Sequence, residues 1–464
     1  MEHMKDDINL IKNRKQDRLR DEKISSLLLQ FSIPATIGML VNALYNIVDR
    51  IFIGQAEDLA SLGLAALTVS FPIMMIMMGL ALMFGAGGAA LFSIKLGEKD
   101  KEGAAKILGN SFFMIFLTSF LFMVIALIYL EPLLRLFGAS DTIMPYAKEY
   151  MKIILYASIL QGPSVGCNHF MRADGSPKQA MVSMFIGAGF NIVFDYVFIF
   201  IFHMGMTGAA LATIGGQGLS AIWGVSYFLT KRSNIKLKLK NMIPNGRLIR
   251  KIGLAGLPSF FNQISTSIIN LVLNNRLGAF GGDIAISTMG AVTSIQQLMI
   301  MPIVGINHGS QPIIGYNRGA MLYHRIKETL IKAITAATLI VVFGFLVTRL
   351  FPREIIRMFG KERSFIELGA KFIRVWFMLV PVVGAQMIGA LYFQSVGKPK
   401  ISLVLTLTRQ IIFLIPAVYF LSNRFGLNGI LYAGPFADGA SFLITIVFLI
   451  MEFRHLNYII KSKS

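Results

Sequence analysis

Long apolar runs recur along the whole chain, separated by short polar, charged or Gly/Pro-rich connections. The pattern predicts about twelve helical spans, at residues 27–53, 62–93, 106–130, 143–170, 179–202, 208–230, 252–275, 284–315, 328–350, 366–394, 401–421 and 427–451. Each run is long enough for a hydrocarbon core about 30 Å thick, which takes about 20 helical residues to cross. Because a lone segment in lipid satisfies its backbone hydrogen bonds only as a helix, the pattern predicts an all-α integral membrane protein with twelve transmembrane helices.

The second half of the chain repeats the first. A shift of 224 residues superimposes Pro34 on Pro258, Asn46 on Asn270, Gly54 on Gly278 and Gly85 on Gly309. Shifts of 222 and 221 superimpose Gly97 on Gly319, Gly175 on Gly397, Pro177 on Pro399, Lys178 on Lys400, Gly205 on Gly426 and Ser220 on Ser441. Because each copy holds six spans, both insert with one orientation and form two pseudo-symmetric six-helix lobes. Two such lobes can rock about a site near the membrane midplane, which is typical of a transporter.

The spans and the repeat divide the chain into five parts. We expect a cytoplasmic N-terminal segment, an N-lobe, a basic cytoplasmic linker, a C-lobe and a cytoplasmic tail, at residues 1–26, 27–230, 231–251, 252–452 and 453–464.

Composition agrees with a membrane protein, since 55% of residues are hydrophobic and only 15% are charged. The net charge of +20 comes from Lys and Arg in the connections, without the aromatic or zinc motifs of nucleic-acid-binding proteins. With the N-terminus inside, the inner connections are basic, as the positive-inside rule requires, although the outer connection at 349–363 is basic too. We expect a multi-pass protein of the cell (plasma or inner) membrane with both termini cytoplasmic and no cleaved signal peptide. The single Cys167 excludes an internal disulfide.

One acid interrupts the first apolar run. Asn42, Asn46 and Asp49 are spaced so that they share one face of a helix. An Asp at a bilayer centre costs about 2.5 to 3.5 kcal/mol on the insertion scale, so it usually faces a bundle interior or a water-filled path. Asp49 is therefore a candidate functional residue. Alternatively, the neighbouring Arg50 neutralises it and the pair anchors the span at the interface.

A second polar face lies in the fifth span, where Asn191 and Asp195 are four residues apart. With Asp49 and the Thr213 hydroxyl, they could form an oxygen-rich pocket that binds a proton or Na⁺. In the second half the four positions become Leu273, Phe413, Ala417 and Gly434. The scaffold therefore does not demand polarity there, and function is concentrated in the first lobe. Alternatively, Asn191 and Asp195 only bridge helices.

Other polar and flexible residues allow two interpretations. Tyr45 could line the pocket with Asn42 and Asn46, or pack as an ordinary aromatic residue. Met289, like the methionines of the second span, could line a cavity for ligands of varied shape, or face lipid or core. Asp438 in the last span has no comparable cluster around it and is expected to make a structural hydrogen bond. His169 and His308 are expected to be packed.

The segments Asn46-Ile-Val-Asp49-Arg-Ile-Phe-Ile-Gly54 and Asn191-Ile-Val-Phe-Asp195 resemble those of the multidrug and toxic compound extrusion (MATE) family, in its MepA-like branch. The resemblance covers essentially the whole chain. It implies a V of two six-helix lobes that exports bulky, often cationic compounds in exchange for H⁺ or Na⁺. It also implies a cation site at the positions of Asp49, Asn191, Asp195 and Thr213. Another branch uses acids of the second lobe, but residues 252–275 contain none.

Together these observations predict a secondary active multidrug antiporter rather than an enzyme. Its partners would be small-molecule drugs or organic cations and the lipid bilayer, with no nucleic acid, no obligate protein partner and no cofactor beyond the coupling ion. A flippase for a lipid-linked saccharide is the alternative, but it would favour a strongly cationic central cavity, and Arg50 is the one basic residue near mid-span in the early helices. A membrane prenyltransferase would need a clustered aspartate motif for Mg²⁺, which is absent from the sequence.

Overall fold

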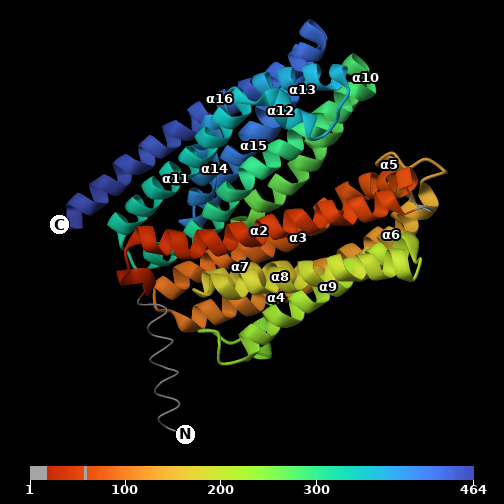
Figure 1. Ribbon diagram of the computed structural model, residues 1–464. Helices are drawn as coiled ribbons and strands as arrows, with labels where there is room; N and C mark the ends of the chain where they lie inside the picture. Colours follow the sequence, from red (N-terminus) through yellow and green to blue (C-terminus); the bar gives the residue numbers. More distant parts are fainter. Residues whose placement is uncertain (1–17, 57–59, 464) are drawn as a thin grey trace.

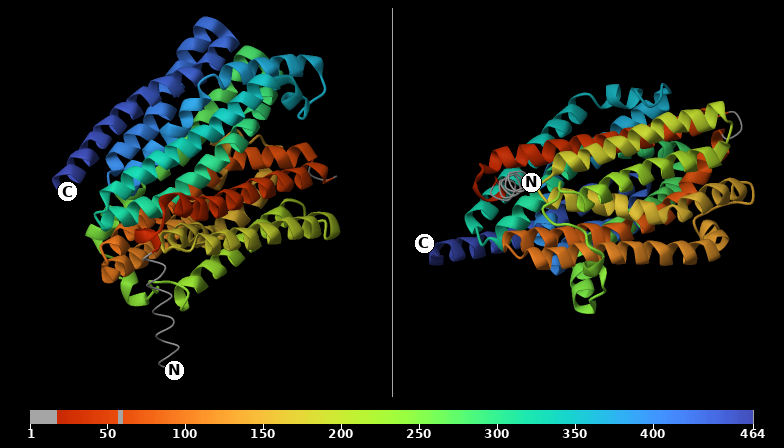
Figure 2. Two further views of the ribbon diagram at one scale, coloured as in Figure 1. Left: turned by 60° about the vertical axis from the view of Figure 1, so that its left-hand side comes forward. Right: turned by 90° about the horizontal axis from the view of Figure 1, so that it is seen from below.

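The computed structural model describes residues 18–56 and 60–463, so residues 1–17 of the predicted N-terminal segment lie outside it. The described residues form two helical bundles that are stacked against each other (Figure 1). The left view of Figure 2 shows the same two bundles from another direction.

The first bundle contains α2 (Ile24–Gln55), α3 (Ala60–Gly97), α4 (Lys101–Ile128), α5 (Leu130–Leu136), α6 (Met144–Tyr156), α7 (Ser158–Ala173), α8 (Pro177–Tyr196), the π-helix η1 (Val197–Ile201) and α9 (Gly205–Leu229). The short 3₁₀ helix η2 (Leu239–Met242) lies in the linker. The second bundle contains α10 (Gly246–Gly319), α11 (Tyr323–Leu350), α12 (Pro352–Arg357), α13 (Arg363–Trp376), α14 (Val380–Ser395), α15 (Pro399–Leu407), the π-helix η3 (Thr408–Leu414) and α16 (Ile415–Lys463).

The twelve predicted spans are all helical, although some are merged and others broken. Helix α10 holds two spans and changes direction at Gly282, whose φ is +65°, and α16 changes direction at Gly426 with φ +57°. The predicted spans 143–170 and 366–394 are each broken in two, the second by a 51° bend between α13 and α14. A proline in the first turn of α14 explains this break, because it supplies no backbone N–H to the preceding turn.

Backbone geometry repeats along with the sequence. Gly175 and Gly397 have φ of +83° and +82°, and Gly205 and Gly426 both have +57°. Even a non-glycine pair, Lys99 and Met321, shares the left-handed region with φ of +61° and +58°. Equivalent turns therefore adopt the same unusual conformation in both halves, which confirms the two-lobe repeat structurally.

The lobes meet at one end of the molecule, where α3 and α10 approach backbone to backbone. A Cβ built on Gly256 would lie 1.7 Å from the Met83 carbonyl oxygen, and one on Gly319 would lie 1.9 Å from that of Ile94. Helix α2 joins this contact, since a Cβ on Gly309 would lie 2.7 Å from the Ser32 nitrogen. Both described ends of the chain lie here, and the bundles diverge toward the end that carries α5 (Figure 1). We call these the closed end and the diverging end.

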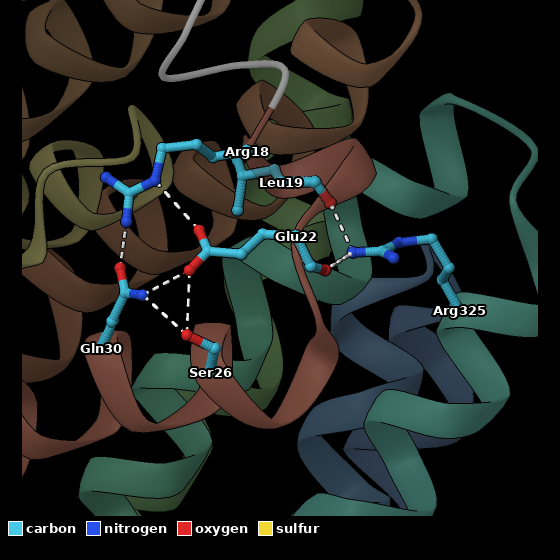
Figure 3. A network of polar contacts seen from close by, with 6 residues as sticks. All are labelled: Arg18, Leu19, Glu22, Ser26, Gln30 and Arg325. Carbon is cyan, nitrogen blue, oxygen red and sulfur yellow. Dashed lines mark hydrogen bonds and ion pairs between the residues drawn. The ribbon is translucent and has the colours of Figure 1, made fainter.

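A polar clasp strengthens the closed end. The Arg325 Nη2 of α11 donates to the backbone oxygens of Glu22 and Leu19, at 2.6 and 3.3 Å. Figure 3 shows this guanidinium reaching the chain just before α2, beside a separate network of Arg18, Glu22, Ser26 and Gln30. These carbonyls end a helical turn and lack intrahelical partners, so the cation stabilises them. The clasp ties the first residues of one lobe to the other lobe.

Hydrophobic packing differs between the two ends. One large core cluster contains buried residues of both lobes, including Phe92, Phe170, Ile252 and Ile313. A second cluster, which includes Ile73, Met151 and Met206, contains first-lobe residues only. The first lobe therefore has a core of its own toward the diverging end, beside the candidate site.

Candidate functional site

Three helices of the first lobe carry the predicted cation-site residues. Asp49 lies in α2, Asn191 and Asp195 in α8, and Thr213 in α9, and α8 packs against both other helices. All four side chains are buried, with exposed fractions of 9% for Asp49, 2% for Asn191, 0% for Asp195 and 8% for Thr213. Helix α8 passes directly into the π-helix η1 after Asp195, and such bulges are frequent at functional sites.

The structure brings the four residues together. The Asn191 Nδ2 donates to the Thr213 Oγ1 at 3.3 Å. The carboxyl groups of Asp49 and Asp195 lie within hydrogen-bonding reach of each other, from α2 to α8. Arg50, the partner in the alternative interpretation, is exposed and lies near enough to attract the Asp49 carboxylate, so Asp49 faces both this cation and Asp195.

Several oxygens of this cluster have no donor among the described residues: Asp49 Oδ1, Asn191 Oδ1 and both carboxyl oxygens of Asp195. Ionised carboxylates only accept hydrogen bonds, so two of them in contact repel unless a proton or a cation lies between them. A buried charge without a partner is also costly. A proton or a cation between the two carboxylates would remove both costs.

The donor set is composed of oxygens, from two carboxylates, one amide and one hydroxyl. Hard cations such as Na⁺ and the proton suit this set, whereas zinc and copper prefer nitrogen and sulfur ligands. The described residues include no group of three or more His, Cys, Asp or Glu side chains that could hold a metal ion.

Sequence reasoning missed Tyr150 of α6. This tyrosine is 2% exposed, its hydroxyl contacts Thr213, and it lies close to Asp49 and Asp195. The predicted span 143–170 contained it, but a tyrosine does not interrupt an apolar pattern. The repeat holds a signal that could have found it, because the equivalent residue in the second half is Phe372, which lacks the hydroxyl. Tyr150 thus differs between the halves as the other four residues do.

The predicted substrate-cavity residues fall into two places. Asn46 is exposed and donates to the backbone oxygen of Asn42 at 2.7 Å. Tyr45 is half-buried, contacts Asn46 and lies near both carboxylates. Met289 is not part of this group, since it lies in α10 within the core cluster that includes second-lobe residues and is only 3% exposed.

The second lobe also contains a buried acid, but this acid has a basic partner. Its buried Asp438 forms an ion pair with Arg409 at 2.7 Å, where the Asp438 side chain is 5% exposed. Asp438 therefore accepts a side-chain hydrogen bond, as expected from the sequence. His169 and His308 also pack as expected, with ring centroids 5.1 Å apart across the two lobes.

The sequence model of the MatE family matches this chain twice, at residues 34–197 and 258–420. The chain belongs to the MatE family. The two matched regions fall one in each half, so the family model recognises the same duplication as the internal repeat.

Named relatives cover almost the whole chain. The multidrug export protein MepA of Staphylococcus haemolyticus (strain JCSC1435) is 24% identical over 413 residues, which are 89% of this chain and 90% of that protein. MepA of Staphylococcus aureus (strain N315) is 25% identical over 427 residues, covering 92% of this chain and 94% of that protein.

Solved structures have the same fold. The MATE multidrug transporter DinF-BH, determined in complex with a ligand, is 40% identical, with a TM-score of 0.87 and coverage of 93% of this chain and 96% of that chain. An outward-facing conformation of a multidrug resistance MATE family transporter is 24% identical, with a TM-score of 0.88 and coverage of 95% and 98%. The chain is therefore a multi-pass membrane protein with the twelve-helix, two-lobe MATE fold.

Proposed function

We propose that this protein is a secondary active multidrug exporter, which moves bulky, often cationic hydrophobic compounds out of the cell in exchange for H⁺ or Na⁺. The observation that carries the proposal is the proximity of two buried acids, Asp49 and Asp195. Asp49 Oδ1 and both carboxyl oxygens of Asp195 lack donors in the described part of the chain. The names of the relatives, multidrug export protein MepA and multidrug transporter DinF-BH, support the substrate class.

The proposed coupling follows from this contact. A proton or Na⁺ bound between the two carboxylates holds α2 against α8, and its loss leaves two like charges that push these helices apart. A drug that binds the other arrangement of α2 competes with the cation, so each ligand weakens the other, as reciprocal linkage requires. The membrane potential adds about 2.3 kcal/mol per 100 mV for each charge that crosses.

The orientation is also a proposal. The closed end carries both described ends of the chain and the basic linker, and the positive-inside rule assigns such a basic end to the cytoplasm. In that orientation the two lobes diverge toward the outside, in the arrangement that releases a drug and takes up a cation. Alternating access would then require the closed end to open.

A flippase for a lipid-linked saccharide is less well supported. Such a protein needs basic groups at the centre to hold a pyrophosphate, but the buried polar cluster of the first lobe is acidic. Translocation of a saccharide lipid without any drug transport would favour the flippase.

The test uses purified protein in proteoliposomes with a fluorescent cationic dye. A pH gradient without Na⁺ and a Na⁺ gradient at equal pH are imposed separately, so the gradient that drives dye transport identifies the coupling ion. Asp195→Asn and Asp49→Asn should abolish gradient-driven transport. Asp141→Asn is the matched control, because Asp141 is an exposed acid whose side chain is 87% accessible. Full coupling in either site variant would remove that residue from the mechanism.

A further inference from the structure

A groove of about 370 Å³ lies on the second lobe near the closed end. Its walls include Leu254 and Leu257 of α10 and Ile401 and Leu403 of α15, with Lys398 just before α15 and Lys400 in its first turn. The volume lies in the range of small-molecule sites, about 300 to 1,000 Å³. An apolar trough with basic groups at one end matches an acyl chain below an anionic headgroup.

Three basic side chains at this groove, those of Lys400, Arg247 and Arg250, are exposed to solvent. Lys400 is exposed and has no hydrogen-bond or ion-pair partner in the described part of the chain. Arg247 and Arg250 are exposed two turns and one turn before Leu254, and the spacing 247, 250, 254 and 257 places all four residues on one face of α10. The sequence contains no Asp or Glu between Asp195 and Asp283. The mouth of the groove is therefore strongly positive.

One acid does lie nearby, but it is already paired. Glu452 of α16 accepts from Lys398 at 2.5 Å and from the Tyr392 hydroxyl at 3.0 Å. Its side chain is 9% exposed. This contact fixes the Lys398 stem in the wall of the groove and leaves Lys400 to face a ligand.

The first lobe provides an internal comparison. With the shift of 224, Gly246, Arg250 and Leu254 correspond to Glu22, Ser26 and Gln30. In the first lobe these residues satisfy one another, because Glu22 accepts from Ser26 at 2.9 Å and from Gln30 at 2.5 Å (Figure 3). The same helix face thus carries a closed polar network in one lobe and an open basic groove in the other. The fold does not require the groove, so its chemistry belongs to the second lobe.

We propose that this groove binds an anionic phospholipid, with one acyl chain against Leu254 and Leu257 and the phosphate between Lys400 and Arg250. Basic pockets between transmembrane helices at the cytoplasmic side are suited to such headgroups. The wall of the groove also borders the other lobe, since a Cβ on Gly397 would lie 3.7 Å from the Ile94 Cδ1 of α3. The bound lipid therefore sits beside the contact between the lobes. This inference does not depend on the transported compound.

Native mass spectrometry of the purified full chain tests the proposal, with phosphatidylglycerol and phosphatidylcholine of identical acyl chains as probes. We expect tighter binding of phosphatidylglycerol. Removing a basic residue should weaken it about fivefold (about 1 kcal/mol each), so Lys400→Gln with Arg250→Gln should weaken it about 25-fold. Leu254→Trp should fill the groove and lower the binding of both lipids.

The matched control is Lys361→Gln with Arg363→Gln, which removes two exposed basic residues, one just before α13 and one at its first position. This control should bind phosphatidylglycerol as the unmodified protein does. Inorganic phosphate should not displace the lipid, because it cannot occupy the apolar trough. Equal affinity for the two lipids, wild-type binding by the double variant, or displacement by phosphate would each overturn the proposal.

Discussion

Replacing Gly256 with alanine should hold the two lobes apart at the closed end. A Cβ at this position would lie 1.7 Å from the carbonyl oxygen of Met83 and 2.5 Å from its carbonyl carbon. Both atoms belong to the backbone of α3, so no side-chain rotation can relieve the clash. The complementary position on α3 also has no room for a Cβ, since one on Gly87 would lie 2.5 Å from the Gly256 nitrogen.

The geometry sets the size of the effect. Ordinary contact of a Cβ begins near 3.4 Å, so α3 and α10 must separate by 1.7 Å or more at this point. Overpacking a well-fitted contact typically costs about 1 to 3 kcal/mol. Because the cost falls on the arrangement with this end closed, the equilibrium should shift about 5- to 150-fold toward arrangements with this end open.

Spin labels at Lys101→Cys and His324→Cys would report this shift. The two residues are exposed and follow the closed-end contacts of α3 and α10, and the native Cys167 is buried and should not react. Double electron–electron resonance should show a longer or broader distance distribution in Gly256→Ala. Dye transport should fall as well, because the arrangement with this end closed becomes less populated.

Gly253→Ala is the control for Gly256→Ala. It adds the same methyl group one turn earlier in α10, but the atom it would meet is the flexible Met83 Cε at 3.3 Å. Its distances should match those of the unmodified protein. If Gly256→Ala gave unchanged distances and unchanged transport, the backbone contact between the lobes would not control the conformational equilibrium.

Two further predictions concern single contacts. Tyr150→Phe removes the hydroxyl that contacts Thr213 and should reduce gradient-driven dye transport in proteoliposomes. The control Phe372→Tyr, at the equivalent position of the second half, should not reduce it. Equal transport by Tyr150→Phe and the unmodified protein would exclude a role for the Tyr150 hydroxyl. Asp100 caps the N-terminus of α4 by accepting from the Gly103 N–H, and this bond and Lys95 lower the pKa of Asp100 below the usual 3.8. Because the pKa is lower in the folded state, the ionised cap stabilises the fold above about pH 4, and this stabilisation is lost as pH falls through the folded-state pKa. Asp100→Ala should therefore cost about 1 kcal/mol near neutral pH, and thermal denaturation should show this difference shrinking in acid rather than growing.

The spans and the repeat could be predicted because membrane insertion of each helix depends on its own local sequence. Each helix needs its own apolar run, and equivalent turns need the same glycine, as at Gly175 and Gly397. Hydropathy does not single out Tyr150, because a tyrosine does not interrupt an apolar span, and only its replacement by Phe372 in the repeat marks it. The four residues of the predicted site could be identified from the sequence, because polar side chains in an apolar span are costly and therefore rare.

The conformation was not predictable from hydropathy. The contact of Gly256 with Met83 depends on how the lobes meet, and a sequence that cycles between two arrangements must be compatible with both. The break between α13 and α14 was also missed, because the run 366–394 stays apolar across the bend. The cavity role predicted for Met289 stays a prediction, since its side chain lies in the core.

The pair Arg409 and Asp438 leads to a last prediction, on the asymmetry of the two lobes. In the first lobe Asp49 and Asp195 lie close together, and neither forms an ion pair with a described residue. In the second lobe Asp438 forms an ion pair with the Arg409 guanidinium at 2.7 Å. Arg409→Gln should leave Asp438 buried without its partner and destabilise the protein by about 3 to 5 kcal/mol, the usual result of breaking a buried pair on one side.

The double variant Arg409→Gln with Asp438→Asn should recover most of that loss, because two neutral groups can hydrogen-bond without desolvating a charge. Thermal denaturation of the purified protein would measure both changes. In the first lobe the analogous neutral change, Asp49→Asn with Asp195→Asn, should raise thermal stability in the absence of the coupling ion while abolishing coupled transport. Removing charge should therefore lower the free energy of unfolding in the second lobe, where Asp438 has Arg409 as its counter-charge, and raise it in the first lobe, where the two acids face each other. A loss of stability in the first-lobe double variant as large as that in Arg409→Gln would instead mean that Asp49 and Asp195 are held by partners within the protein.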